Sequence, residues 1–391
     1  MPWNQTDAMN ERLQMLGEHL SGDYGAAELA RRYGVSRKTI YEWIARYEQE
    51  GVEGLKERSS APHHHPNATD QEVVDEILCL KERWPQWGAP KLLARLQRDM
   101  KVGPCPAEST VSEILKRHGL SFPRKKRRHA VPSSQPLAHA QEPNAVWCVD
   151  FKGWFRTGDG SKCSPLTLTD AYSRYLLRCQ GLGESTGHLL VQPIMISAFR
   201  EYGMPWAMRS DNGPPFATSA LGGLSKLSVW WLRLGIKVER IEPGKPQQNG
   251  RHERFHRTLQ QHTAAPPART LGAQQRCFEQ FTQEYNQQRP HEALGQDTPA
   301  EHYERSSREY PARLPAAREF PDEWQKRSVR TGRMKWNGCE VNITQALAGE
   351  YVGLEPVGDG RWAVWFQDLE LGIFDERTMS VKGHKSLHSR A

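Results

Sequence analysis

The sequence contains no apolar run of the roughly 20 residues that a membrane-spanning helix needs. Residues 1–10 are polar and lack the apolar segment of a secretory signal. The seven cysteines are scattered and none forms a C-x-x-C pair, which disfavours both a disulfide framework and a zinc knuckle. We therefore expect a cytoplasmic protein that has no membrane partner and works in a reducing environment.

The chain is long, polar and basic. It has 391 residues, and a single compact domain rarely exceeds about 300 residues, so we expect several domains. Hydrophobic residues make up 37% of the sequence, which is enough to build cores. The net charge of +7 suits a polyanionic partner, of which nucleic acid is the commonest.

Residues 1–60 show the pattern of a helix-turn-helix domain. A first helical segment ends at Gly34, Ser36 can cap a second helix, and Ile40 and Trp43 give that helix an apolar stripe. A helical bundle without a DNA role is the alternative. In the DNA-binding interpretation, the second helix presents three side chains to a DNA groove: Arg37, Lys38 and Tyr41.

A second helical unit, also compatible with a helix-turn-helix, is expected over residues 70–122. The three adjacent histidines at 63–65 precede it in a stretch that we interpret as a solvated turn. Residues 123–144 form a basic, proline-rich linker. Its run of like charges either contacts phosphate or is merely solvated, and it consists of Arg124, Lys125, Lys126, Arg127 and Arg128.

The pattern changes after residue 145. Three early apolar strands are followed by alternating helices and strands, which predicts a central α/β core over residues 145–305, with a mixed sheet and helices on both faces. Residues 321–391 contain short apolar runs between glycine-containing turns, which predicts a small all-β domain, either a barrel or a sandwich. The fold class is therefore multidomain, with all-α units, an α/β core and an all-β end.

Three carboxylates of the core can converge at one edge of the sheet. Asp150 ends one expected strand, Asp211 follows another, and Glu253 lies on the helix expected over residues 247–262. Oxygen ligands of this kind hold Mg²⁺ or Mn²⁺, and two such ions can cut and join phosphodiesters. Each acid taken alone is more often a turn residue or a surface ion-pair partner.

At these residues the chain resembles the insertion-sequence transposases that have a retroviral-integrase-like Asp-Asp-Glu core. The similar segments are Trp-x-x-Asp-Phe-Lys at 147–152, Ser-Asp-Asn-Gly-Pro-Pro-Phe at 210–216, and the motifs at 243–258 and 285–300. The resemblance implies an RNase H-like fold and a polynucleotidyl transferase that cleaves DNA strands and transfers them at the ends of a mobile element. It further implies that Asp150, Asp211 and Glu253 are the catalytic metal ligands and that they hold two ions of Mg²⁺ or Mn²⁺.

The expected partner is double-stranded DNA, both the terminal inverted repeats and the target. Because two element ends must be joined in concert, we also expect a homo-oligomer.

The sequence departs from the family pattern in one spacing and in one charged position. The 41 residues between Asp211 and Glu253 exceed the spacing in many relatives, and a helix over 221–234 is expected to fill the gap. Gln260 stands where many relatives have a basic residue, and Arg257 can supply that charge.

The helix around Glu253 is expected to place one stripe toward the metals and the DNA. The stripe follows helical spacing and comprises Asn249, Glu253, His256, Arg257 and Gln260. The expected phosphate contacts of this region are Lys245, Asn249, Arg254 and Arg257.

Two other functions compete with this interpretation. His252, Glu253 and His256 spell H-E-x-x-H, the helix motif of zinc peptidases, although the sequence shows no evident third ligand. A non-catalytic helix-turn-helix DNA-binding regulator would use the same N-terminal region without the chemistry. An intact carboxylate triad argues against such a regulator.

Overall fold

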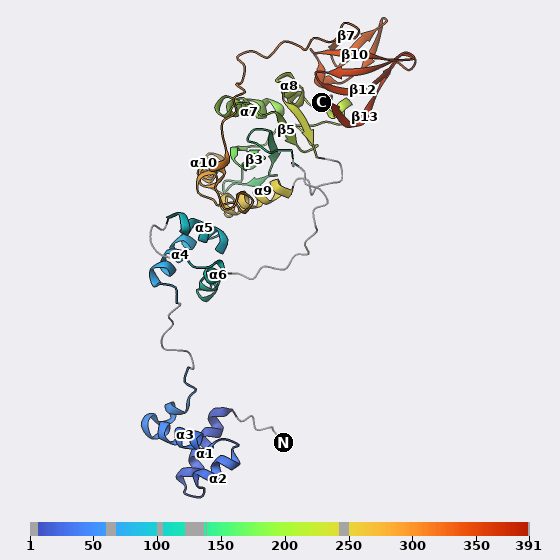
Figure 1. The fold of residues 1–391 in the computed structure, drawn as a ribbon. Helices are drawn as coiled ribbons and strands as arrows, with labels where there is room; N and C mark the ends of the chain where they lie inside the picture. The colour runs from blue at the N-terminus through green and yellow to red at the C-terminus, as the bar shows by residue number, and fades with distance from the viewer. Residues whose placement is uncertain are drawn as a thin grey trace. The chain divides into compact units, whose positions relative to one another are not determined.

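The computed structural model describes residues 7–59, 68–99, 105–121, 137, 139–241 and 250–389. The chain divides into two compact units, Met1–Thr69 and Asp70–Ala391 (Figure 1). Among the described residues, no helix is long and apolar enough to cross a membrane.

The first unit is all-helical. Its helices are α1 (Ala8–Leu20), α2 (Ala26–Arg32), α3 (Arg37–Glu50) and the 3-10 turn η1 (Gly51–Leu55). Gly34 has a φ of +66°, which few other residues adopt, and it turns the chain between α2 and α3. The Ser36 hydroxyl then accepts a hydrogen bond of 3.1 Å from the Thr39 amide and caps α3. The predicted helix, turn and capped helix are confirmed.

The second unit begins with three more helices, α4 (Gln71–Arg83), α5 (Ala89–Asp99) and α6 (Glu108–Arg117). Trp84 and Trp87 stack with their ring centroids 4.2 Å apart at the end of α4. Around them pack apolar side chains from all three helices, including Ile77, Leu92 and Val111. The expected helical segment thus has its own apolar core.

A mixed sheet forms the centre of the second unit. Its strands are β1 (Val146–Phe151), β2 (Phe155–Arg156), β3 (Lys162–Asp170), β4 (Leu176–Leu182), β5 (Ala207–Ser210) and β6 (Lys237–Arg240). The order is β2-β3-β1-β5-β6, and β4 pairs with β3. β1 runs antiparallel to β3 but parallel to β5, and β5 runs parallel to β6. The predicted mixed sheet is confirmed.

Helices cover both faces of this sheet. They are α7 (His188–Tyr202), α8 (Lys226–Arg233), α9 (Gly250–Thr263), α10 (Leu271–Gln287) and α11 (Pro299–His302). Trp147 and Leu166 pack on one side with α7 and α8. Cys163 and Leu176 pack on the other side with α9 and α10, because alternate strand residues point to opposite faces.

The helix expected over residues 221–234 is shorter than predicted. Residues Leu221–Gly223 form the 3-10 turn η2, in which Gly222 has a φ of +61°. Helix α8 begins only after Ser225, whose hydroxyl caps it in a capping box with Ser228. The apolar residues of 221–234 therefore belong to a turn and a shorter helix, and their helical spacing did not show where the turn lies.

The C-terminal part is all-β, as predicted. Its strands are β7 (Gln325–Arg330), β8 (Arg333–Trp336), β9 (Cys339–Asn342), β10 (Tyr351–Gly358), β11 (Arg361–Phe366), β12 (Leu369–Asp375) and β13 (Ser380–Ser389). They form one sheet in the order β13-β12-β11-β10-β7-β8-β9, and the two end strands also contact each other. The sheet therefore curls toward a barrel. Val229 and Leu232 of α8 pack into its core, which ties this part to the α/β core.

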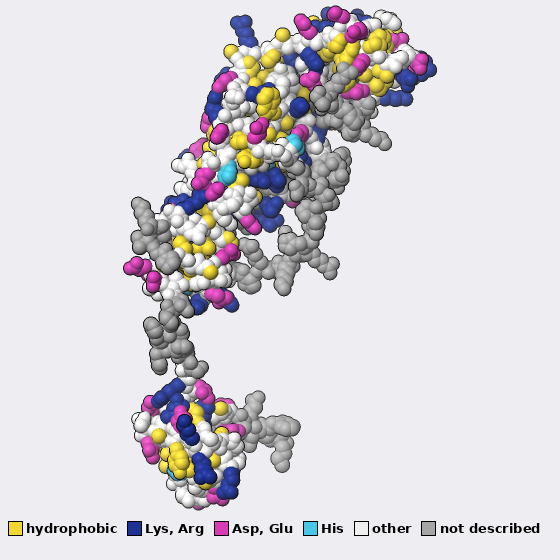
Figure 2. Space-filling model, in the orientation of Figure 1, with side chains coloured by type: hydrophobic (Ala, Val, Ile, Leu, Met, Phe, Trp, Pro, Cys, Tyr) yellow, Lys and Arg dark blue, Asp and Glu magenta, His cyan; other side chains and the backbone are white. Residues whose placement is uncertain are grey.

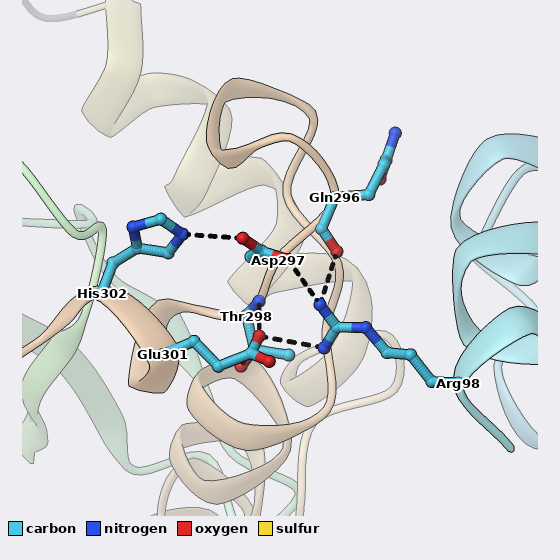
Figure 3. Close-up of polar contacts among 6 residues, drawn as sticks. All are labelled: Arg98, Gln296, Asp297, Thr298, Glu301 and His302. Carbon is cyan, nitrogen blue, oxygen red and sulfur yellow. Dashed lines mark hydrogen bonds and ion pairs between the residues drawn. The ribbon is translucent and has the colours of Figure 1, made fainter.

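The α4–α6 helices dock on the α/β core through α5 (Figure 3). The Arg98 guanidinium donates to Asp297 at 2.8 Å and to Glu301 at 2.9 Å. Near the start of the same helix, the Lys91 ammonium donates to the backbone carbonyl of Pro290. Helix α5 therefore lies against the segment that follows α10.

Candidate active site and nucleic-acid interface

The structure brings Asp150 and Asp211 together. Asp150 lies near the C-terminal end of β1, and Asp211 directly follows β5, the parallel neighbour of β1. The ends of adjacent parallel strands meet at one edge of a sheet. Burial and the nearby Asp150 carboxylate raise the pKa of Asp211, although the Gly213 amide donates to its carboxylate at 3.2 Å.

This pair of carboxylates fits a divalent cation. Two like charges, one of them half-buried, repel each other, and a cation between them would remove that cost. Carboxylate oxygens are the hard ligands that Mg²⁺ and Mn²⁺ prefer. The donor set is therefore suited to the ions expected from the sequence.

Glu253 lies on the exposed side of α9. Arg257 and Gln260 are exposed with it, so these three residues share one face of the helix as predicted. The part of the chain that the structure describes gives Glu253 no hydrogen bond or ion pair. The prediction for His256 is wrong, because its side chain is only 8% exposed and faces the sheet instead. The fifth member of the predicted stripe, Asn249, lies outside the described residues.

The Thr167 hydroxyl links α9 to the sheet by hydrogen bonds, in addition to the apolar packing of that helix. The Thr167 hydroxyl on β3 lies 3.0 Å from the His252 Nε2 and 2.9 Å from the His256 Nε2. It also donates to the Asp150 carbonyl oxygen at 3.1 Å. A hydroxyl has one proton and two lone pairs, so this arrangement is satisfied when both imidazoles donate from Nε2.

Both imidazoles are neutral. Burial lowers the pKa of His252 to about 4. Burial, reinforced by His252 and Lys152, lowers the pKa of His256 to about 2. Neutral rings with a proton on Nε2 are the form that the Thr167 hydrogen bonds require.

Asp150 also lies beside the two histidines. One ligand atom from each of Asp150, His252 and His256 falls within 4.8 Å of the others, so the three residues could hold a metal ion. From the sequence, a third partner for the histidine pair was not evident, because Asp150 is about a hundred residues away. Both Nε2 atoms bond to Thr167, and the unprotonated Nδ1 of each ring lies outside these hydrogen bonds.

The candidate DNA contacts divide by location. Arg37, Lys38 and Tyr41 are all exposed on the first turns of α3, and Tyr41 is 61% exposed. Arg254 and Arg257 are exposed on α9. Lys and Arg side chains gather over this part of the core in Figure 2. The other predicted contacts, Lys245, Asn249, Arg124, Lys125, Lys126, Arg127 and Arg128, lie outside the described residues.

Beside α9 lies a basic pocket of about 560 Å³ that the sequence analysis missed. Its cations come from four separate parts of the chain, α5, the turn between β3 and β4, α9 and the end of α10: Lys91, Arg174, Arg251, Arg254 and Arg289. The Arg-Pro-His segment at 289–291 was a visible signal, but its neighbours are distant in sequence.

Other residues of the 285–300 motif are structural. The Asn286 side chain accepts from the Leu176 amide at 2.8 Å and donates to the Leu176 carbonyl at 2.9 Å. It therefore joins α10 to β4 in the way that a neighbouring strand would. Thr298 and Glu301 form the capping box of α11.

Family comparisons agree with this architecture. A helix-turn-helix domain matches residues 11–63, and a homeodomain-like domain matches residues 39–115. Two integrase core domain families match residues 140–246 and 234–299. The C-terminal domain of IS481 family transposases matches residues 326–382.

The chain is similar to curated proteins of bacterial insertion elements. The uncharacterized 31.7 kDa protein of IS407 from Burkholderia multivorans is 26% identical over 60% of this chain and 82% of its own length. The transposase InsD of IS2 from Escherichia coli is 25% identical over 71% of this chain and 91% of its own length. An uncharacterized 39.2 kDa protein of IS476 from Xanthomonas euvesicatoria is 29% identical, but the match covers only 49% of that protein.

The chain is also similar to solved structures of viral integrases. The catalytic core domain of HTLV-2 integrase in complex with magnesium matches 42% of this chain and 98% of that chain, with 15% identity and a TM-score of 0.32. A simian T-cell lymphotropic virus intasome chain matches 81% of this chain, with 14% identity and a TM-score of 0.37.

Proposed function

We propose that this chain, which resembles the insertion-sequence transposases with an integrase core, catalyses metal-dependent DNA strand cleavage and strand transfer at the ends of a mobile element. The observation that carries the proposal is the pairing of Asp150 with Asp211 at the ends of adjacent parallel strands. This pair lies in the segment that matches integrase cores, next to the helix that carries Glu253.

Asp150, Asp211 and Glu253 would hold Mg²⁺ or Mn²⁺, with two ions at the site. Ions of this kind, when bound, activate a water or 3′-hydroxyl and stabilise the leaving oxygen of a phosphodiester. The chain itself positions the acids. Thr167 bonds α9 to the sheet beside Asp150, and the exposed face of α9 would then present Glu253 and Arg257 to the DNA.

DNA recognition is assigned to the helical regions. The first turns of α3 would enter a groove of the terminal repeat with Arg37, Lys38 and Tyr41. Residues 1–60 and 70–122 would act as two DNA-binding domains, 123–144 as a basic linker, 145–305 as the catalytic core, and 321–391 as a separate β domain. Joining two element ends in concert would require a homo-oligomer.

The test is cleavage and strand transfer on labelled terminal-repeat DNA, with Mg²⁺, Mn²⁺, Zn²⁺ or EDTA. Asp150→Asn, Asp211→Asn and Glu253→Gln should each abolish both reactions and leave DNA binding largely intact. Glu279→Gln is the matched control, because it removes an exposed carboxylate of α10 and should remain active. Equal loss of binding and cleavage in all three site variants would count against the proposal.

The zinc-peptidase alternative is favoured by one observation, the approach of Asp150 to His252 and His256. Against it, the Glu253 side chain, which would be the general base of a peptidase, is exposed, whereas the two histidines are buried. Zinc-dependent peptide hydrolysis without action on DNA would establish the peptidase. DNA binding without cleavage under every condition would indicate a regulator.

A further inference from the structure

The basic pocket beside α9 concentrates positive charge. Arg251 and Arg254 reach it from α9, Arg174 from the turn after β3, and Arg289 from the end of α10. Lys91 of α5 adds a fifth cation from the docked helical segment. The volume of about 560 Å³ far exceeds the roughly 30 Å³ of one water molecule, so the pocket admits a larger group.

These cations lack matching acids. Among the described residues that line the pocket, Glu292 is the one carboxylate. Glu284 lies near Arg289, and the buried Asp170 near Arg174, but Asp170 is already bonded to Ser173 and to the Asn144 amide. The cations therefore repel one another, which is a cost that a folded protein keeps only where something compensates it.

The pKa values of two titratable groups in the pocket, Lys91 and His291, are lowered. Burial and the nearby Arg289 lower the pKa of Lys91 to about 8. Burial, together with Lys91 and other pocket cations, lowers the pKa of His291 to about 3. In both cases burial is the larger cause, and the neighbouring cations act in the same direction.

Two buried side-chain nitrogen atoms of the pocket have no hydrogen-bond partner among the described residues. They are the buried Arg289 Nη1 and the buried His291 Nε2. A buried polar group without a hydrogen bond costs about 1–3 kcal/mol, so such atoms mark a place where a partner is expected. An anion with several acceptor oxygens would satisfy them and the surrounding cations together.

We propose that this pocket binds a phosphate of the DNA backbone and clamps one strand between the α4–α6 helices and the integrase core. The inference rests on the proposed function and extends it. Lys91 lies in the α4–α6 helices, whereas Arg254 lies next to Glu253 on α9. A phosphate held by both would couple the docking of the helical segment to the position of DNA at the acidic site.

DNA binding as a function of salt tests the clamp. The full chain is titrated into a short fluorescent duplex in EDTA, which separates binding from cleavage. Each phosphate contact contributes about 0.9 to the slope of log K against log salt. Arg254→Gln and Arg289→Gln should each lower the slope, by up to about 0.9 if the phosphate contact is lost, and weaken binding about tenfold at moderate salt.

Two further variants keep the test specific. Arg276→Gln removes an exposed charge from the same helix α10 outside the pocket, so its slope and affinity should equal those of the parent chain. Glu292→Gln removes the carboxylate of the pocket lining and should tighten binding. Misfolding cannot produce tighter binding, so this variant distinguishes a clamp from structural damage.

The outcomes separate the pocket from the chemistry. Unchanged slopes in Arg254→Gln and Arg289→Gln, with cleavage intact in the parent chain, would overturn the clamp and leave the proposed function standing. Lowered slopes in a chain that never cleaves would support the clamp and refute the proposed function. A third outcome concerns inorganic pyrophosphate. If it raises the melting temperature of the parent chain but not that of Arg289→Gln, and the DNA-binding slopes of the variants are unchanged, the pocket binds free phosphates and the clamp is overturned.

Discussion

Replacing Thr167 with valine should release α9 from the sheet. The side chain is fully buried, and its hydroxyl bonds to the Asp150 carbonyl and to both imidazoles of α9. Valine has nearly the same volume, so the change removes the hydrogen bonds without opening a cavity. It therefore isolates the contribution of the hydroxyl.

The expected loss of local stability in Thr167→Val follows from the number of hydrogen bonds that the Thr167 hydroxyl makes. Three hydrogen bonds at about 1 kcal/mol each give about 3 kcal/mol, and the buried groups left unpaired push the cost upward within a range of about 1–3 kcal/mol per group. Because the chain has several domains, one global unfolding energy is not well defined. Hydrogen exchange of the α9 amides measures the local opening energy directly.

Thr167→Ser is the control. Serine keeps the hydroxyl and loses only a methyl group, which should cost about 1 kcal/mol. Thr167→Val should expose α9 to exchange far more than Thr167→Ser, and should lower strand transfer more than DNA binding. Equal exchange in the two variants would refute the anchoring role of the hydroxyl.

The remaining predictions concern separate parts of the molecule. Ser36→Ala should destabilise the N-terminal unit by about 1 kcal/mol, measured by thermal unfolding of a fragment that contains residues 1–69. Arg98→Gln should increase exchange in α5 and α11 while changing stability by only about 1 kcal/mol, because the ion pairs are part-exposed. Asp211→Asn should raise the melting temperature of the metal-free protein, because the raised pKa of Asp211 means that its ionised form destabilises the fold. Added Mg²⁺ should raise the melting temperature of the parent chain more than that of the variant. Acid should destabilise α9, because the pKa values of His252 and His256 in the folded chain lie below the ordinary 6.5. As the pH falls below 6.5, the unfolded chain binds more protons than the folded chain, and each histidine lowers the stability by up to about 1.4 kcal/mol per pH unit. Hydrogen exchange of the α9 amides at pH 6.5 and pH 5 measures this loss.

Local patterns in the sequence determined much of the architecture. Gly34 and Ser36 set the turn and the cap of the first unit, because both effects depend on the backbone within three residues. The three early strands, followed by alternating helices and strands, predicted a mixed sheet covered on both faces. Asp150 and Asp211 could be placed at one edge because strand ends are visible in the sequence and adjacent parallel strands end together.

Other features were decided only by packing between distant segments. The sequence placed His256 with Glu253 because helical spacing shows which residues share a face, but the rotation of α9 depends on what the sheet offers. Thr167, 89 positions before His256, draws the histidines inward and leaves Glu253 outside. The basic pocket likewise requires Lys91 to reach a segment 199 positions away. No local pattern encodes such contacts, because they arise from the shapes of surfaces that exist only after the chain has folded.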